Sequence, residues 1–321
     1  MSIEIKKCAV LGAGVMGAQI AGHIANAGIP SLLFDVNNDL AKKGIEGLTK
    51  LKPAPLFSSK NTSLITSCTY DNDLEKLKDC DLIIEAVAEK IEIKHTVYKN
   101  LLPHLKENAI LASNTSGIPL ANLVEVLPDE VQSRFLISHF FNPPRYLRLL
   151  ELVKGPKTSD DVYNVVSEFG EVTLGKGVVH AKDTPGFIGN RLINASGPLT
   201  FQKAMDYGLT VEDVDSLAGT LIGNAKSAYF RTQDVVGLDT ALNVMNNMFE
   251  RVTTESEDER QKFKAPELLV KLVEDGRLGQ KSGAGWYKKE GKEILSLDFD
   301  TMEYSPTKKR FFDTIRVGKP I

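Results

Sequence analysis

A glycine-rich turn near the N-terminus constrains the fold of this chain more than any other feature. The apolar run from Ile5 to Leu11 stops at Gly12-Ala13-Gly14-Val15-Met16-Gly17. A helical apolar pattern follows and ends at Gly28, and a second apolar run, 29–34, ends at Asp35. This order of strand, glycine turn, helix, strand and acid predicts a Rossmann-type, doubly wound α/β sheet.

The same residues predict a dinucleotide site. The first glycine allows the tight turn, the second lets the backbone approach a pyrophosphate, and the third lets helix pack on strand. N–H groups at the helix N-terminus favour the phosphates. Asp35 stands where the fingerprint places the acid that binds the adenosine ribose, and its carboxylate would repel a 2′-phosphate. We therefore expect NAD rather than NADP, contacted by Gly12, Ala13, Gly14, Val15, Met16, Gly17 and Asp35.

Composition narrows the class of partner. A chain of 321 residues is long enough for two domains, and a net charge of −3 gives no electrostatic footprint for nucleic acid. The three cysteines lack CxxC spacing, so neither a disulfide framework nor a metal site is expected, and a reducing cytoplasm is the simplest compartment. No apolar run is long enough to insert in a membrane. A small-molecule substrate is the expected partner.

Polar residues follow the later strands of the predicted sheet. Short apolar runs at 64–68, 80–87 and 109–112 alternate with helical patterns, which predicts βαβ units and a mainly parallel sheet. Ligands of such sheets bind at the carboxyl ends of the strands. Glu89 and the run Ser113-Asn114-Thr115-Ser116 are therefore the residues expected near a ligand.

Two further apolar runs, 135–141 and 147–153, flank a turn at Asn142-Pro143-Pro144-Arg145. An antiparallel ladder centred on Arg145 places His139 opposite Glu151, within contact range. A carboxylate inside an apolar strand needs a partner, and it would fix the tautomer of the imidazole. The pair is thus a candidate acid/base couple, and Ser116 and Asn190 are candidate donors to a reacting oxygen.

The sequence also predicts the domain organisation. Asp183-Thr184-Pro185-Gly186-Phe187 separates a β-rich part from one with helical periodicity. We expect an NAD-binding Rossmann domain over 1–183, an all-α domain for substrate or dimerisation over 184–290, and a tail or linker over 291–321. The polar run 253–260 is expected to be a mobile loop.

Several motifs together resemble the 3-hydroxyacyl-CoA dehydrogenase family. They are GAGVMGAQIA at the start, SNTS at 113–116, HFFNPP at 139–144, LLELV around Glu151, DTPGFIGNR at 183–191 and GQKSGAGWY at 279–287. Within the family, LKPAPL at 51–56, PPRYLRLLE and FRTQDVVGLD are similar to bacterial proteins that fuse this dehydrogenase to an enoyl-CoA hydratase.

The resemblance implies NAD-dependent oxidation of (S)-3-hydroxyacyl-CoA to 3-oxoacyl-CoA in fatty-acid β-oxidation. It implies that His139 is the catalytic base, that Glu151 orients it, and that Ser116 and Asn190 bind the substrate. Further cofactor contacts implied are Glu89, Lys94, Ser116, Asn142 and Lys281. It also implies a homodimer or association with an enoyl-CoA hydratase domain, in a natural protein that continues beyond Ile321.

Two other functions stay open from the sequence. The same architecture serves dehydrogenases of small hydroxy acids without CoA, as in relatives that resemble lens crystallin and gulonate dehydrogenase. Alternatively, the chain is a binding module that is inactive without further C-terminal domains. Competition by CoA thioesters separates the first alternative from the main reading, and turnover by the isolated chain excludes the second.

Overall fold

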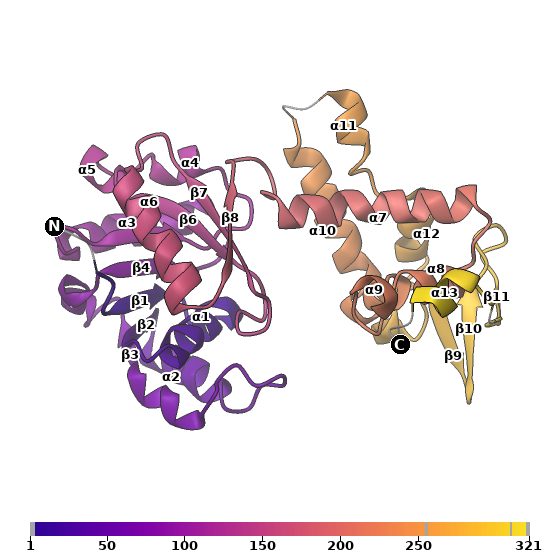
Figure 1. The fold of residues 1–321 in the computed structure, drawn as a ribbon, viewed down its shortest axis with the longest axis horizontal. Helices are drawn as coiled ribbons and strands as arrows, with labels where there is room; N and C mark the ends of the chain where they lie inside the picture. Colours follow the sequence, from indigo (N-terminus) through magenta and orange to yellow (C-terminus); the bar gives the residue numbers. More distant parts are fainter. Residues whose placement is uncertain (1–3, 254–255, 309, 319–321) are drawn as a thin grey trace. The chain divides into compact units, whose positions relative to one another are not determined.

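The computed structural model describes residues 4–253, 256–308 and 310–318. The chain divides into two compact units, residues 1–188 and 189–321 (Figure 1). Within the described residues, no helix is both long and apolar enough to cross a membrane.

An eight-stranded sheet forms the centre of the first unit, in the order β3-β2-β1-β4-β5-β6-β7-β8. Strands β1 to β6 are mutually parallel, whereas β7 pairs antiparallel with β6 and parallel with β8. The order 3-2-1-4-5-6 is that of dinucleotide-binding sheets, so the predicted Rossmann-type fold is confirmed. The strands are β1 (Cys8–Leu11), β2 (Ser31–Asp35), β3 (Ile65–Thr69), β4 (Leu82–Glu85), β5 (Ile110–Ser113), β6 (Phe135–Phe140), β7 (Leu149–Lys154) and β8 (Gly177–Ala181).

Helices cover both faces of this sheet. The α-helices are α1 (Val15–Asn26), α2 (Asn38–Gly47), α3 (Ile91–Leu101), α4 (Leu120–Val124), α5 (Asp129–Gln132) and α6 (Asp160–Glu168), the last continued by a π-helical turn, Phe169–Thr173. Short 3-10 helices span Ser59–Leu64, Leu74–Asp79 and Leu102–His104. Buried side chains of α1 and α6 belong to one apolar cluster, and those of α3, α4 and α5 belong to the other.

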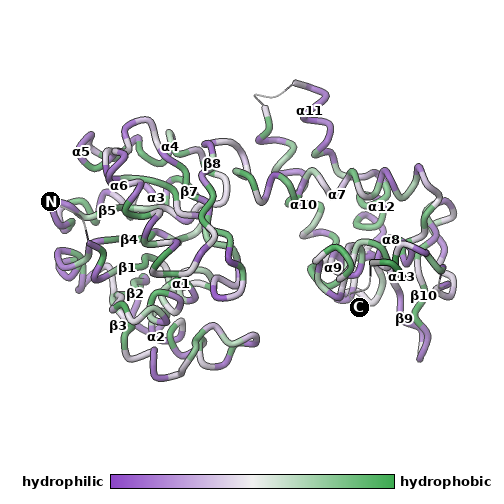
Figure 2. Tube along the Cα trace, in the orientation of Figure 1, coloured by the Kyte–Doolittle hydropathy of each residue, from purple (hydrophilic) through white to green (hydrophobic). Residues whose placement is uncertain are grey.

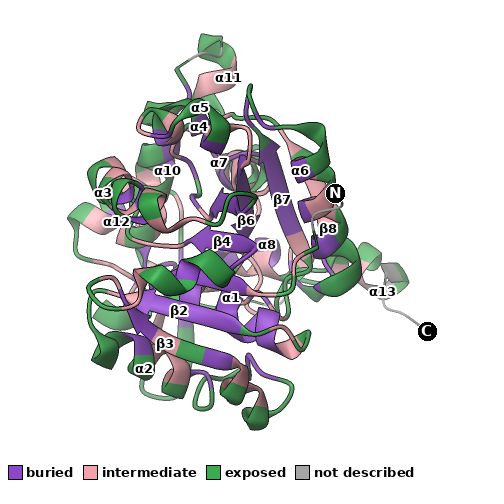
Figure 3. Cartoon of the chain, turned by 90° about the vertical axis from the view of Figure 1, so that its left-hand side faces the viewer, coloured by how far each residue is buried: buried purple, intermediate pink, exposed green. Residues whose placement is uncertain are grey.

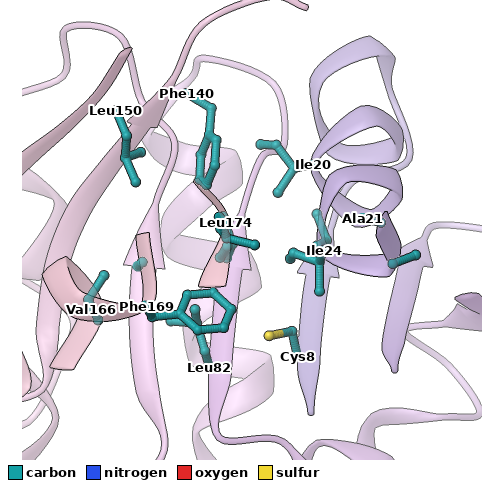
Figure 4. Close-up of a cluster of buried hydrophobic side chains, with 14 of the residues drawn as sticks. Cys8, Ile20, Ala21, Ile24, Leu82, Phe140, Leu150, Val166, Phe169 and Leu174 are labelled. Atoms are coloured by element: carbon teal, nitrogen blue, oxygen red, sulfur yellow. The ribbon is translucent and has the colours of Figure 1, made fainter. Parts of the chain in front are cut away.

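The central strands read as continuous apolar runs because both of their faces are buried (Figure 3). In β1, Cys8 and Val10 join the cluster under α1, while Ala9 and Leu11 join the cluster under α3. Figure 4 shows the first cluster, where Ile20 and Ile24 of α1 point toward side chains of the sheet. This apolar packing fixes α1, the helix that follows the glycine turn, on the sheet.

The second unit is largely helical, as predicted. Its helices are α7 (Gly189–Asp206), α8 (Val211–Leu217), α9 (Phe230–Val236), α10 (Leu238–Arg251), α11 (Glu257–Gln261), α12 (Glu267–Glu274) and α13 (Asp313–Gly318), with 3-10 turns at Thr220–Ile222 and Gln280–Ser282. Trp286 is buried in its core and contacts the rings of Phe201, Phe230 and Phe299.

A small sheet begins at the end of the predicted all-α domain and continues into residues 291–321, where the sequence predicts a tail or linker. Strands β9 (Tyr287–Glu290), β10 (Glu293–Leu297) and β11 (Tyr304–Pro306) are antiparallel neighbours. β9 is hydrophilic and partly or fully exposed (Figure 2), but Leu295 and Leu297 of β10 are buried. These two side chains explain why the segment packs on the second unit.

The predicted mobile loop over 253–260 differs in part from the structure. Residues 254–255 lie outside the described residues. The hydrophilic run that follows forms α11 (Figure 2), and the hydroxyl of Ser256 accepts the N–H of Glu259 at its first turn. Three acidic residues in that first turn complement the helix dipole, which explains a helix in so polar a run.

Candidate active site

The glycine turn has the backbone geometry that its sequence predicts. Gly12 has a φ of +101°, and a Cβ atom there would lie 2.7 Å from the carbonyl oxygen of Ala86. A Cβ atom on Gly17 would lie 1.8 Å from the carbonyl oxygen of Gly12. At Gly14, by contrast, a Cβ atom would meet no described atom within 4 Å. The turn therefore requires glycine at both ends and leaves open space at its middle glycine, where a pyrophosphate approaches in this fold.

The start of α1 and the end of β2 complete this half of the site. Among the described side chains, none caps the first N–H groups of α1, and its first turn contains no acidic residue. Free N–H groups and the positive helix end suit phosphate oxygens. Asp35 lies beside the turn, where its carboxylate accepts the N–H groups of Ala13 and Val36, both at 2.7 Å. These residues fit the adenosine diphosphate part of a dinucleotide.

Three predicted cofactor residues meet at the ends of β4 and β5. The Glu89 carboxylate accepts the N–H of Ser116 at 3.0 Å and the hydroxyl of Thr115 at 2.5 Å, and the Lys94 ammonium lies 3.2 Å from its other oxygen. Burial would raise the pKa of Glu89, but Lys94 and these donors outweigh it, so its pKa is lowered. Glu89 is therefore ionised at neutral pH.

Glu85 is a further residue of this cluster that we did not predict from the sequence, and it binds Lys94, the partner of Glu89. Glu85 is fully buried at the end of β4, and its carboxylate accepts from Lys94, Tyr98, Ser113 and the N–H of Val87 at 2.7–2.8 Å. The signal was present in the sequence, because an acid within the apolar run Leu-Ile-Ile-Glu-Ala-Val needs partners as much as Glu151 does.

The predicted register of the β6–β7 hairpin is confirmed. His139 pairs with Glu151 across the antiparallel ladder, and the imidazole Nδ1 lies 2.7 Å from a Glu151 carboxylate oxygen. The other oxygen accepts the N–H of Ile188 at 2.9 Å. With Nδ1–H donated to the carboxylate, Nε2 of His139 is the ring nitrogen left to accept a proton.

Aromatic side chains surround the His139 ring. The ring centroid lies 4.4 Å from that of Phe141 and 5.6 Å from that of Phe187, and His139 is only 5% exposed. Phe187 has a φ of +48°, unusual for a residue with a Cβ atom. The imidazole is thus held between apolar walls, where its interaction with Glu151 is weakly screened by water.

Asn142 follows β6 and connects the hairpin to the glycine-turn helix. Its side-chain oxygen accepts a hydrogen bond from Gln19 of α1 at 3.0 Å. Asn114, between the predicted Ser113 and Ser116, accepts the N–H of Phe140 at 2.8 Å. Hydrogen bonds of this kind tie α1, β5 and β6 together at the carboxyl edge, so the structure brings Asn142 to the edge that carries His139.

Two predicted site residues, Asn190 and Lys281, belong to the second unit. Asn190 lies in the first turn of α7, and its carbonyl oxygen accepts the side-chain N–H of Asn194 at 2.7 Å. Lys281 lies in the 3-10 turn before β9 and forms an ion pair with Asp239. Their expected contacts with substrate and cofactor stay predictions.

The cysteines take no part in this arrangement. All three are free and buried, and burial raises the pKa of the Cys68 thiol to about 11 and that of Cys80 to about 12. Such thiols are neutral and unreactive at physiological pH. Within residues 4–253, 256–308 and 310–318, no group of three or more His, Cys, Asp or Glu side chains is placed to hold a metal ion.

Proteins from several bacteria are similar to this chain. "Probable 3-hydroxyacyl-CoA dehydrogenase" of Bacillus subtilis is 45% identical over 99% of the chain, and "Putative fatty acid oxidation complex trifunctional enzyme" of Rickettsia felis is 38% identical over 96%. The chain spans only 43% and 44% of their lengths. The crystal structure of FadB2 from M. tuberculosis has a TM-score of 0.72 at 32% identity, covering 89% of this chain and 99% of that one.

Family sequence models match nearly the whole described fold. Residues 7–184 match "3-hydroxyacyl-CoA dehydrogenase, NAD binding domain", and residues 186–289 match the C-terminal domain of the same family. The first match agrees with the glycine turn and Asp35, which fit NAD in the structure. The sheet order, the dinucleotide site and both matches lead to one conclusion: the chain belongs to the 3-hydroxyacyl-CoA dehydrogenase family and is an NAD-binding oxidoreductase.

Proposed function

We propose that this chain catalyses the NAD-dependent oxidation of (S)-3-hydroxyacyl-CoA to 3-oxoacyl-CoA in fatty-acid β-oxidation. The observation that carries the proposal is the buried His139–Glu151 pair, which joins the neighbouring strands β6 and β7. An alcohol oxidation needs a base for the hydroxyl proton, and a histidine held by a carboxylate is suited to that task.

His139 takes the proton of the substrate hydroxyl at Nε2, because Nδ1 is engaged by Glu151. The imidazolium that forms is stabilised by the negative charge of Glu151, which is itself held by the N–H of Ile188. NAD, when bound, supplies the acceptor for the hydride that leaves C3 of the substrate. The apolar walls of Phe141 and Phe187 keep water from competing for the base.

The remaining site residues are proposed to bind and orient the substrate and NAD. Ser116, whose N–H and hydroxyl face Glu89, is proposed to hydrogen-bond the substrate near its reacting carbon. Gly12–Gly17, Asp35, Glu89, Lys94 and Asn142 are proposed to contact NAD, supported by their gathering at one edge of the sheet. For Asn190 and Lys281 the proposal rests on the motif resemblance alone.

The setting of this reaction is also a proposal. The name of the Rickettsia relative supports a place in fatty-acid oxidation. The relatives' greater length supports association with further domains, an enoyl-CoA hydratase domain or a second copy of this chain. A cytoplasmic location is supported by the three free cysteines.

The test is NADH-dependent reduction of acetoacetyl-CoA by the purified chain, followed as loss of NADH absorbance. Free acetoacetate at the same concentration is the control. We expect turnover with the CoA ester and a rate at least about 100-fold lower with the free acid, because only the ester offers the remote CoA contacts that orient the reacting carbon. Equal rates would favour a small hydroxy-acid dehydrogenase. Absence of turnover with normal NADH binding would favour a module that depends on further domains.

A further inference from the structure

Three charged side chains form a connected group at the carboxyl end of β4. The Lys94 ammonium lies 2.7 Å from Glu85 and 3.2 Å from Glu89, so it joins the two carboxylates. Glu85 is fully buried and Lys94 is 1% exposed, whereas the Glu89 side chain is 33% exposed. The Glu85–Lys94–Glu89 triad therefore has two members in the core and one at the surface of the site.

The triad carries a net charge of −1. One oxygen of Glu85 accepts hydrogen bonds from Val87 and Lys94, and the other accepts from Tyr98 and Ser113. The pKa of Glu89 is lowered, because Lys94 and the Thr115 and Ser116 donors outweigh the effect of burial. Two carboxylates share a single ammonium, and the excess negative charge faces the site at Glu89.

The strand order places this charge on one particular half of the dinucleotide site. Asp35 ends β2, on the side of β1 that binds the adenosine half in this fold. Glu85 and Glu89 follow β4, on the other side of β1, where the sheet forms its second mononucleotide half. That second half receives the nicotinamide, whose ring is cationic in the oxidised cofactor and neutral in the reduced one.

We propose that the Glu85–Lys94–Glu89 triad sets the relative affinity of the site for the two redox forms, by stabilising the cationic nicotinamide of oxidised NAD. Glu85 and Lys94 are positioning residues in this role, since they hold and balance the charge of Glu89. The proposal rests on the proposed function only in placing the nicotinamide beside Glu89. Adenosine and phosphates are identical in both redox forms, so they cannot produce such a bias.

The test is calorimetric measurement of the Kd of NAD⁺ and of NADH, without substrate, for the parent chain and for Glu85→Gln. Glutamine has nearly the same shape and retains hydrogen-bonding groups for Lys94, Tyr98 and Ser113, but it makes the triad neutral. We expect the ratio Kd(NAD⁺)/Kd(NADH) to rise roughly three- to tenfold, the range for one charge acting through partly solvated protein. A tenfold change corresponds to about 30 mV in the two-electron potential of the bound cofactor.

Two further variants make the result decisive. Glu89→Gln also neutralises the triad, at its more exposed end, and is expected to raise the ratio in the same direction even if Glu85→Gln does not fold. Asp35→Asn is the matched control, because it removes a carboxylate on the adenosine half. It should raise the Kd of NAD⁺ and the Kd of NADH by the same factor.

The outcomes separate this inference from the proposed function. A ratio unchanged within twofold in a folded Glu85→Gln or Glu89→Gln variant, including an equal loss of affinity for both forms, overturns the inference. A raised ratio supports it whether or not the chain reduces acetoacetyl-CoA, because no substrate is present in the measurement.

Discussion

His23 shows how burial of a single residue on α1 makes stability depend on pH. It is 7% exposed, its Nε2 lies 3.0 Å from the carbonyl oxygen of Leu174, and its pKa is lowered to about 4, mainly by burial and then by the nearby charge of Lys176. The neutral ring donates Nε2–H to that carbonyl. Since the unfolded residue has a pKa near 6.5, the folded state resists protonation.

The sign of the pH dependence follows from this lowered pKa. The stabilisation from His23 is complete above about pH 6.5 and is lost as the pH falls toward 4, which amounts to about 3 kcal/mol over that interval. His23→Gln keeps a side-chain N–H for Leu174 but does not titrate. Urea unfolding is followed by circular dichroism at pH 7 and pH 4.5. Between these pH values, we expect the free energy of unfolding of the variant to fall by about 2 kcal/mol less than that of the parent chain. Equal losses would show that His23 is not the titrating group.

At the residue scale, the His139–Glu151 pair could be predicted from sequence, whereas for Glu85 the sequence indicates that a partner is needed but not which residues supply it. His139 and Glu151 belong to adjacent strands of one hairpin, so counting residues from the turn gives their register. The partners of Glu85, which include Lys94 and Tyr98, lie on a helix whose packing on the sheet is a tertiary feature. A pattern within one strand contains no information about that packing.

At the scale of elements, the turn between β1 and α1 makes two glycines behave differently. Gly17→Ala would place a Cβ atom 1.8 Å from the carbonyl oxygen of Gly12, so α1 must move off β1. We expect a loss of about 3 kcal/mol in the free energy of unfolding. Gly14→Ala fills open space, so stability should change by less than about 1 kcal/mol while NADH affinity falls at least about tenfold. Denaturant unfolding and NADH fluorescence check both; similar stability losses in the two variants would contradict this account.

The proline-rich segment after α2 is held by a residue far along the chain. The Arg145 guanidinium donates to the carbonyl oxygens of Ala54 and Leu56, at 2.6 and 2.7 Å, and lies 4.4 Å from the ring centroid of Phe57. Composition alone predicts an irregular segment here. It does not reveal this anchor, because the two parts are separated by about 90 residues.

Removal of that anchor should free the segment without changing the sheet. We expect Arg145→Ala to raise the rate of tryptic cleavage at Lys60 about tenfold, since local opening loses two hydrogen bonds to a charged donor and one cation–π contact. Arg148→Ala, which changes an exposed arginine three residues further on, is the control. Equal cleavage rates in the two variants, measured by mass spectrometry of the fragments, would contradict the anchoring role.

At the scale of the whole molecule, each unit has its own core. The two large apolar clusters on the sheet consist of residues from the first unit, and the cluster around Trp286 consists of residues from the second. The sequence predicts this division from the change of periodicity after Asp183. It predicts the end of the chain poorly, because buried Leu295 and Leu297 alternate with polar residues in a short strand that resembles a linker in composition.

The single tryptophan makes the two units separately observable. Trp286 is 1% exposed in the second unit, so its fluorescence reports unfolding of that unit, whereas circular dichroism reports both. NADH binding should raise the Tm of the circular dichroism transition by several degrees and that of the fluorescence transition by less, because most proposed cofactor contacts lie in the first unit and only Lys281 lies in the second. If both transitions moved by the same amount, the units would unfold as one cooperative structure.

The central claim is that His139, oriented by Glu151, is the base of this dehydrogenase. The most direct measurement is turnover of acetoacetyl-CoA by His139→Gln, with the Kd of NADH determined on the same sample. We expect kcat to fall by about 100- to 10,000-fold while the Kd of NADH stays within about twofold, because the imidazole is proposed to serve proton transfer rather than cofactor binding. A variant with near-parental kcat would contradict the assignment, and a large rise in the Kd of NADH would place His139 in the cofactor site instead.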